Sequence, residues 1–214
     1  MSRVIKFLFF LVVVKPTVLI LLGLNLRGRD RLPAKGPAII VANHNSHLDT
    51  FVLMSLFPLS RIHQIRPVAA ADYFFGNGKL LAWIATRCID IVPLDRSGKA
   101  KREDLFKNCH ESLDQDQILI VFPEGSRGRP EQLSRLRRGV HYLVKERTDV
   151  PVIPVCMHGL GHALPKGEAL FVPFNCDVVA GDPIPPAQDS GEFLSAISDS
   201  FNDLSKYLVT RTQS

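Results

Sequence analysis

The sequence lacks the cysteine pairs that would indicate a disulfide framework or a zinc site. Its four cysteines are isolated in apolar or helical surroundings, and none belongs to a C-x-x-C pair: Cys88, Cys109, Cys156 and Cys176. We therefore expect reduced cysteines and no metal centre. Internal repeats and low-complexity tracts are also missing, which argues against a repeat protein.

Acidic residues are outnumbered, since 21 Asp and Glu face 26 Lys and Arg, giving a formal net charge of +5. This balance favours an anionic partner, either a phosphate-bearing substrate, a nucleic acid or an acidic membrane surface. Aromatic residues are mainly the 13 phenylalanines, beside 3 tyrosines and 1 tryptophan. Most of these phenylalanines lie in apolar runs and no stacking motif is present, so we expect no nucleic-acid partner.

The chain is long enough for one domain, with 214 residues of which 46% are hydrophobic. Its most unusual stretch is residues 4–26, which are almost wholly apolar. Only Lys6 and the pair Lys15-Pro16 interrupt this run, and the basic cluster of Arg27, Arg29 and Arg31 follows it.

Four interpretations of this amino-terminal run compete. A cleaved signal peptide fits poorly, because no small-residue cleavage site separates the run from the rest of the chain. A spanning helix has the length, but it would hold Lys15 at mid-depth and a kink at Pro16. A core helix would have to bury an unusually continuous apolar run. We favour a pair of short helices that dip into one leaflet while their lysines reach toward the headgroups.

Beyond Pro37 the chain alternates strand-like and helix-like segments, which indicates an α/β domain. We expect strands at residues 37–42, 66–71, 88–93, 117–122 and 151–157, with one or two more in 169–181. We expect helices at residues 47–56, 76–87, 99–113, 139–147 and 192–209. The Pro-rich residues 182–186 read as the linker to the last helix.

A polar cluster ends the first of these strands. His44 lies between that strand and a helix that Ser46-x-x-Asp49 opens as a capping box. Ligands of open α/β sheets bind beyond the carboxyl ends of strands, so His44 is placed within reach of a substrate. A general base needs a fixed tautomer, which Asp49 would provide by accepting a hydrogen bond from the ring. The alternative is that Asp49 only caps the helix and His44 is an ordinary loop residue.

Two further strands end in polar groups. The strand near residue 93 is followed by Arg96, and residues 117–122 are followed by Glu124, Gly125 and Arg127. Arginines beside exposed backbone N–H groups bind phosphate well, because the planar fork meets two oxygens at once. A solvated turn and an ordinary glycine loop are the alternatives for the two stretches.

Together these stretches resemble the four ordered blocks of the glycerolipid acyltransferase family, which contains the lysophosphatidate acyltransferases. The blocks are NHNSHLD at 43–49, IVPLDR at 91–96, FPEGSRG at 122–128 and VIPV at 152–155. The pair Arg138-Gly139 is also similar to a basic-Gly pair of the family. Ser126 stands where threonine is common, Gly128 where serine is frequent, and the second block lacks its usual phenylalanine-rich core.

The resemblance implies a role for each matching residue. His44 would be the general base for an acceptor hydroxyl, and Asp49 would orient it. Residues of the second and third blocks would bind the phosphate-bearing acceptor: Arg96, Glu124, Gly125, Ser126 and Arg127. Pro154 matches the fourth block, near the acyl site. Backbone N–H groups near Ser46 are candidates for stabilising the oxyanion, and no cofactor is implied.

The family's fold is a mixed, mostly parallel sheet flanked by helices and preceded by a membrane-binding helix pair. We therefore expect a membrane-attachment segment at residues 1–31 and an acyltransferase domain at residues 32–214. The implied reaction moves an acyl group from acyl-CoA or acyl-carrier protein to a lysophospholipid, most simply 1-acylglycerol 3-phosphate. The active site would face the cytoplasm at a membrane, the inner membrane if the source is bacterial. A different lyso-acceptor, or a non-catalytic membrane-associated binding protein, are the alternatives.

Overall fold

The structure is a computed structural model, and it describes residues 2–71, 78–95, 105–126, 128, 132–163 and 174–210. Its centre is a seven-stranded sheet of order β1-β7-β6-β2-β5-β3-β4. The strands are β1 (Leu22–Arg27), β2 (Ala38–Ala42), β3 (Ile65–Ala70), β4 (Val92–Leu94), β5 (Ile118–Val121), β6 (Val152–His158) and β7 (Phe174–Ala180). Every neighbouring pair is parallel except β6 and β7, which are antiparallel. The expected mixed, mostly parallel sheet is thus confirmed.

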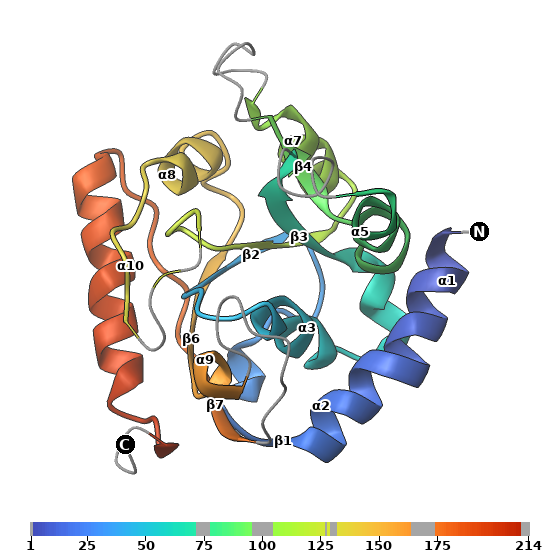
Figure 1. Ribbon diagram of the computed structural model, residues 1–214. Helices are drawn as coiled ribbons and strands as arrows, with labels where there is room; N and C mark the ends of the chain where they lie inside the picture. The colour runs from blue at the N-terminus through green and yellow to red at the C-terminus, as the bar shows by residue number, and fades with distance from the viewer. Residues whose placement is uncertain are drawn as a thin grey trace.

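Helices cover both faces of this sheet (Figure 1). The helical segments are α1 (Ser2–Phe9), η1 (Phe10–Val14), α2 (Lys15–Leu21), η2 (Arg29–Arg31), α3 (Leu48–Ser55), η3 (Leu59–Gln64), α5 (Lys79–Trp83), η4 (Ile84–Ile89), α7 (Lys107–Asp114), α8 (Gly139–Val144), α9 (Leu160–Ala163) and α10 (Ser190–Ser205). The amino-terminal helices and α3 pack on one face, while α7, α8 and α10 pack on the other.

The central strand β2 shows why both faces are covered. Successive side chains of a strand point to opposite faces, so Ile40 and Ala42 join the cluster under α3, whereas Ile39 and Val41 join the cluster under α10. Every residue of β2 is buried. Parallel strands buried on both faces have continuous apolar sequences of this kind.

The expected strand at residues 88–93 is wrong in its first half. The helix that begins at Lys79 continues as the π-helical η4 through Ile89, and the strand begins only at Val92. Cys88 and Ile89 are buried as part of that helix. Asp90 then reverses the chain with a left-handed backbone, at a φ of 62°. A short apolar run is compatible with a buried strand or a buried helix, and periodicity does not separate them.

The amino terminus contains the expected pair of helices, α1 and α2, joined by the π-helical turn η1 (Figure 1). Pro16 lies just beyond this turn and has no N–H to donate to the preceding turn, which accounts for the local widening. Phe10, Val14 and Val18 are buried on the sheet side. The opposite side is apolar too, since Leu19 and Ile20 are 75% and 78% exposed.

The last part of the predicted attachment segment is a strand. Leu22–Arg27 forms β1, which pairs in parallel with β7 at one edge of the sheet. Among the described residues, no helix has both the length and the apolar character needed to cross a membrane. The expected segments 99–104 and 169–173 lie outside the described residues.

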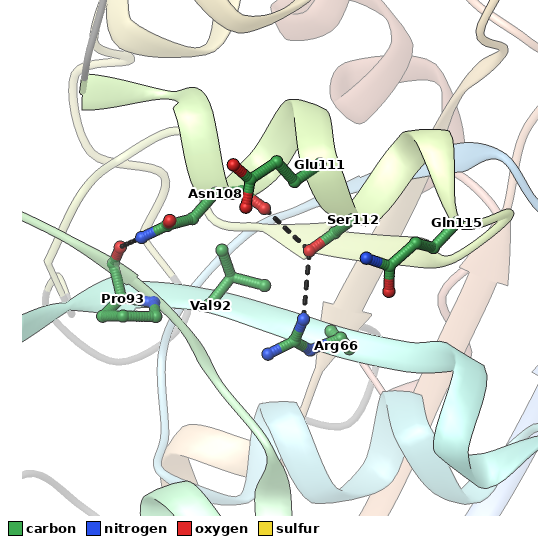
Figure 2. A pocket seen from close by; sticks show the side chains of 7 residues that line it. All are labelled: Arg66, Val92, Pro93, Asn108, Glu111, Ser112 and Gln115. Carbon is green, nitrogen blue, oxygen red and sulfur yellow. Dashed lines mark hydrogen bonds between the residues drawn. The ribbon is translucent and has the colours of Figure 1, made fainter.

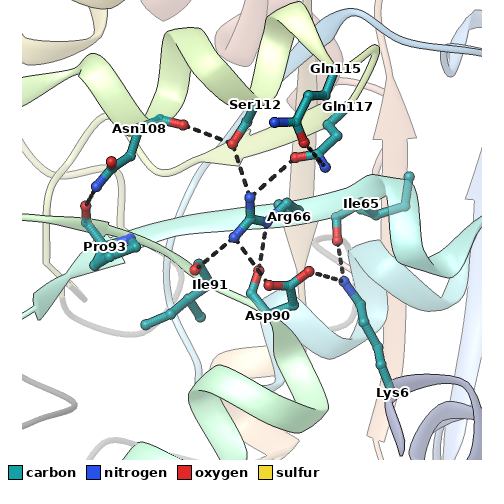
Figure 3. A network of polar contacts seen from close by, with 10 residues as sticks. All are labelled: Lys6, Ile65, Arg66, Asp90, Ile91, Pro93, Asn108, Ser112, Gln115 and Gln117. Atoms are coloured by element: carbon teal, nitrogen blue, oxygen red, sulfur yellow. Dashed lines mark hydrogen bonds and ion pairs between the residues drawn. The ribbon is translucent and has the colours of Figure 1, made fainter. Parts of the chain in front are cut away.

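A buried lysine ties α1 to the sheet (Figure 3). Lys6 is 1% exposed, donates a hydrogen bond to the Ile65 carbonyl at 2.7 Å and lies 3.9 Å from Asp90 Oδ2. Burial lowers the pKa of Lys6 to about 7, while Asp90 opposes that shift and Arg66 adds to it. The neighbouring Arg66 uses all five N–H groups, on Asp90, Ile91, Ser112 and Gln117.

We predict that Lys6 makes the stability of the fold pH-dependent above neutral pH. The folded pKa lies below the ordinary value of 10.5, so the unfolded chain binds more protons between these two values. The penalty for burying charge is full below pH 7 and is relieved as the pH rises. The free energy of unfolding should therefore rise, by at most about 1.4 kcal/mol per pH unit, relative to Lys6→Met.

The measurement is urea unfolding at several pH values between 6 and 9, followed by the emission of Trp83, the single tryptophan. Lys6→Met keeps an unbranched stem of similar length, so other titrating groups cancel in the comparison. A difference between the two proteins that stays constant across this range would contradict the prediction.

Candidate active site

The loop after β2 is anchored at its first residue. The Asn43 side chain donates to the Met157 carbonyl at 2.8 Å and accepts from the Met157 N–H at 2.7 Å. These two bonds take the place of a backbone–backbone pair between the strands, just beyond the point where the pairing of β2 and β6 ends. The loop therefore leaves the sheet at a fixed point, immediately before His44. The sequence blocks contain Asn43, but its role as an anchor depends on a strand 114 residues away.

His44 and Asp49 form the expected pair. His44 Nδ1 lies 2.9 Å from Asp49 Oδ2, and Asp49 is fully buried. The ring also stacks on Phe122, with the centroids 4.0 Å apart and the planes 18° from parallel. The Nδ1–H tautomer fits a donor bond to the carboxylate and leaves Nε2 as the basic nitrogen. The arrangement can accept a proton from a bound hydroxyl.

Asp49 also shapes the loop itself. Its Oδ2 accepts the N–H groups of Asn45 at 2.7 Å and Ser46 at 2.9 Å. The helix begins one residue later than a simple capping box requires, with His47 as its N-cap. Ser46 Oγ accepts the Leu48 N–H at 3.3 Å. The same oxygen therefore holds the loop that precedes the helix and contacts the His44 ring.

Glu124 joins this loop to a second one. Its Oε1 accepts the His44 N–H at 2.7 Å, and its Oε2 accepts the Ser134 N–H at 2.8 Å. The Gly128 N–H donates to the His44 carbonyl at 3.2 Å. Glu124 is 2% exposed. Burial raises the pKa of its carboxyl, and the bonds from His44 and Ser134 oppose that shift. Both carboxylate oxygens thus hold backbone in place.

The remaining candidate residues are placed differently from one another. Gly125 lies beside Glu124 with a φ of 74°, which favours glycine, and Ser126 is exposed next to it. Pro154 is buried within β6, where it lies opposite Val41 of β2. Arg96 and Arg127 lie outside the described residues. The predicted contacts of these residues with substrate remain predictions.

Two kinds of chemistry find no support at the described residues. All four cysteines are buried, and burial raises the pKa of Cys109 to about 12; nucleophilic thiols usually have lowered pKa values. Within the part of the chain that the structure describes, no cluster of His, Cys, Asp and Glu is arranged to hold a metal ion. The His44–Asp49 pair is the arrangement best suited to proton transfer.

A cavity of about 310 Å³ lies elsewhere, between α7 and the strands β3 and β4. Figure 2 shows Asn108, Ser112 and Gln115 above Arg66. Because Arg66 already donates all of its N–H groups to protein acceptors, the cavity offers no free fork for an anion. It shares no lining residue with the loop of His44.

Comparisons with known proteins agree on one family. Residues 23–158 match the family described as Acyltransferase. A chloroplastic 1-acyl-sn-glycerol-3-phosphate acyltransferase of Arabidopsis thaliana is 29% identical over 75% of this chain and 43% of its own length. A 1-acyl-sn-glycerol-3-phosphate acyltransferase of Pseudomonas aeruginosa is 30% identical over 82% of this chain and 63% of its own length. The chain thus spans about half the length of such relatives.

A solved structure shares the fold. The crystal structure of the 1-acyl-sn-glycerophosphate acyltransferase from Thermotoga maritima aligns with a TM-score of 0.71 at 20% identity, covering 95% of this chain and 81% of that one. The match to the family runs from the second residue of β1 to the last residue of β6. We conclude that the chain belongs to the Acyltransferase family.

Proposed function

We propose that the protein transfers a fatty acyl group from an acyl thioester to the free hydroxyl of 1-acylglycerol 3-phosphate, forming phosphatidic acid. The observation that carries this proposal is the buried Asp49 carboxylate 2.9 Å from Nδ1 of the stacked His44 ring. The names of the relatives from Arabidopsis thaliana and Pseudomonas aeruginosa support this acceptor. Acyl-CoA or acyl-carrier protein is the proposed donor.

The proton balance of the reaction needs only one base. His44 Nε2 takes the hydroxyl proton while that oxygen attacks the thioester carbonyl carbon. The carbon–sulfur bond then breaks, and the imidazolium returns the proton to the departing thiolate. Asp49 stabilises the imidazolium between these steps. The N–H groups of Asn45 and Ser46 donate to Asp49, so these two groups hold the loop, and the source of oxyanion stabilisation stays a prediction.

The first prediction from this proposal concerns His44. His44→Ala should lower kcat by a factor of about 100 to 10,000, which is the range for loss of a positioned base. Asp49→Asn should lower kcat less, but still strongly, because the carboxylate that accepts from the loop N–H groups and from the His44 ring is lost. Transfer of a radiolabelled acyl thioester to 1-acylglycerol 3-phosphate in detergent micelles measures both.

His110→Ala is the matched control, since His110 lies on α7, which packs in a different core cluster from α3. Circular dichroism establishes that the variants are folded. Near-normal turnover of folded His44→Ala would overturn the mechanism. Parallel assays with lyso-aminolipid acceptors test the alternative acceptor, and inactivity of the wild type on every acceptor would favour the non-catalytic alternative.

A second prediction separates the two roles considered for Glu124. In Glu124→Gln the amide NH₂ must face a backbone N–H of either His44 or Ser134, because the side chain has only one accepting oxygen. We expect a fall in kcat of roughly tenfold or more, as displaced catalytic groups cost, with the acceptor KM nearly unchanged. A raised acceptor KM at unchanged kcat would instead support the predicted contact with substrate.

We also propose that the outer side of α1 and α2 attaches the protein to an acidic membrane surface on the cytoplasmic side. The exposed apolar side chains of α1, of α2 and of the η1 turn between them include Val4, Leu8, Val12, Leu19 and Ile20. Each CH₂ buried in lipid contributes about 0.8 kcal/mol, and each basic residue near an anionic surface adds about 1 kcal/mol. The sheet-facing side of the same helices is part of the core, so substitution is a cleaner test than truncation.

The third prediction is that Leu19→Gln with Ile20→Gln reduces sedimentation with anionic phospholipid vesicles at least tenfold. Turnover of short-chain acceptors dissolved in water should be retained, because neither residue touches the site. Tyr207→Gln, an exposed position beyond α10, is the control. Unchanged sedimentation of the double variant would contradict attachment through this face.

A further inference from the structure

Arg137 is held beside the active-site loop by two hydrogen bonds. Its backbone N–H donates to the Pro123 carbonyl at 2.8 Å, and its Nε donates to the Glu124 carbonyl at 3.3 Å. The stem of the side chain runs past Gly125. A Cβ added at Gly125 would lie 3.2 Å from Arg137 Cδ and 3.3 Å from Nε. Glycine at this position therefore leaves room for the arginine as well as allowing the backbone turn.

The residue that holds Arg137 also holds the catalytic histidine. Glu124 accepts Arg137 Nε on its carbonyl oxygen and the His44 N–H on its carboxylate. The guanidinium and the His44 loop are therefore positioned by two ends of one buried residue. Attachment to one buried residue keeps the two groups near each other, which suits a binding group that must act together with a base.

Among the described residues, the end of the Arg137 side chain has no hydrogen-bond or ion-pair partner. No hydrogen bond or ion pair from Nη1 or Nη2 is recorded within the described ranges. Arg147 differs, because it pairs with Asp114 and Asp149. Arg135 and Arg138 flank Arg137 and are also exposed. The guanidinium is held at Nε, its two terminal nitrogens can donate to a ligand, and two further arginines lie beside it in the sequence. Such a group suits an anion of the phosphate type.

We propose that Arg137 binds a phosphate group of a substrate through its two terminal nitrogens, beside Gly125 and the His44 loop. Arg137 lies between the third and fourth sequence blocks and belongs to neither. This inference rests on the proposed acyl transfer. The phosphate is either the phosphomonoester of the acceptor or one of the phosphates of a coenzyme A donor, and the two sources present the same chemistry to the fork.

The test compares kinetic constants of Arg137→Gln and Arg137→Lys in detergent micelles. Acceptors with and without the phosphate, 1-acylglycerol 3-phosphate and monoacylglycerol, are each assayed with acyl-CoA and with acyl-pantetheine, which has no phosphate. Arg137→Gln should raise the KM of the substrate that carries the bound phosphate, either the acceptor or acyl-CoA. We expect a rise of about tenfold to a hundredfold, which is the usual effect of losing charged hydrogen bonds. The KM of Arg137→Lys should lie between those of the wild type and Arg137→Gln, because a lysine ammonium lacks the planar pair of donors of a guanidinium.

The pattern of these constants identifies the source. If only the KM for the phosphate-bearing acceptor rises, Arg137 binds the phosphate of the acceptor. If the KM rises for acyl-CoA but not for acyl-pantetheine, Arg137 binds a phosphate of the donor. Unchanged constants, or an equal loss with the phosphate-free substrates, overturn the inference. Arg87→Gln, an exposed arginine on η4, is the control. If the wild type itself fails to transfer acyl groups, the proposed function fails instead, so the two failures are distinguishable.

Discussion

One carboxylate oxygen organises the loop on which the site depends. Asp49 Oδ2 accepts hydrogen bonds from the His44 ring and from two successive backbone N–H groups, at 2.7 to 2.9 Å. This carboxylate is fully buried, so the three bonds lie away from solvent. The loop N–H groups point toward this carboxylate, and the carboxylate holds the His44 ring. A change at Asp49 therefore alters loop geometry and ring orientation together.

The sequence predicted the parts of the site that depend on local order. His44 and Asp49 are five residues apart, and a strand followed by a helix brings them together regardless of what surrounds them. The bridge through Glu124 was not predictable in the same way. Glu124 is 80 residues from His44 and 10 residues from Ser134 along the chain. The contact with His44 therefore requires the register of β2 and β5. The stacking of Phe122 on the His44 ring depends on the same register.

The fold was predictable wherever hydrophobic pattern and length agreed, as they do for β2, β5 and β6. It was not predictable at Cys88 and Ile89, where a short apolar run suited two structures equally. Lys6 is a different case. An isolated lysine in an apolar run was expected to reach toward lipid headgroups, yet Lys6 points into the protein and meets Ile65 and Asp90. Only the packing of α1 on the sheet decides between these directions.

The position of β1 at the edge of the sheet has a consequence for contacts with other chains. Of the strands that the structure describes, it is the last on its side of the sheet, and a free edge of a sheet can add a strand from a neighbouring chain. Its exposed positions are Gly23, Asn25 and Arg27, and Asn25 is engaged with Asp177 through its side-chain amide. A polar amide and a positive charge at this edge disfavour its extension by a strand of another chain.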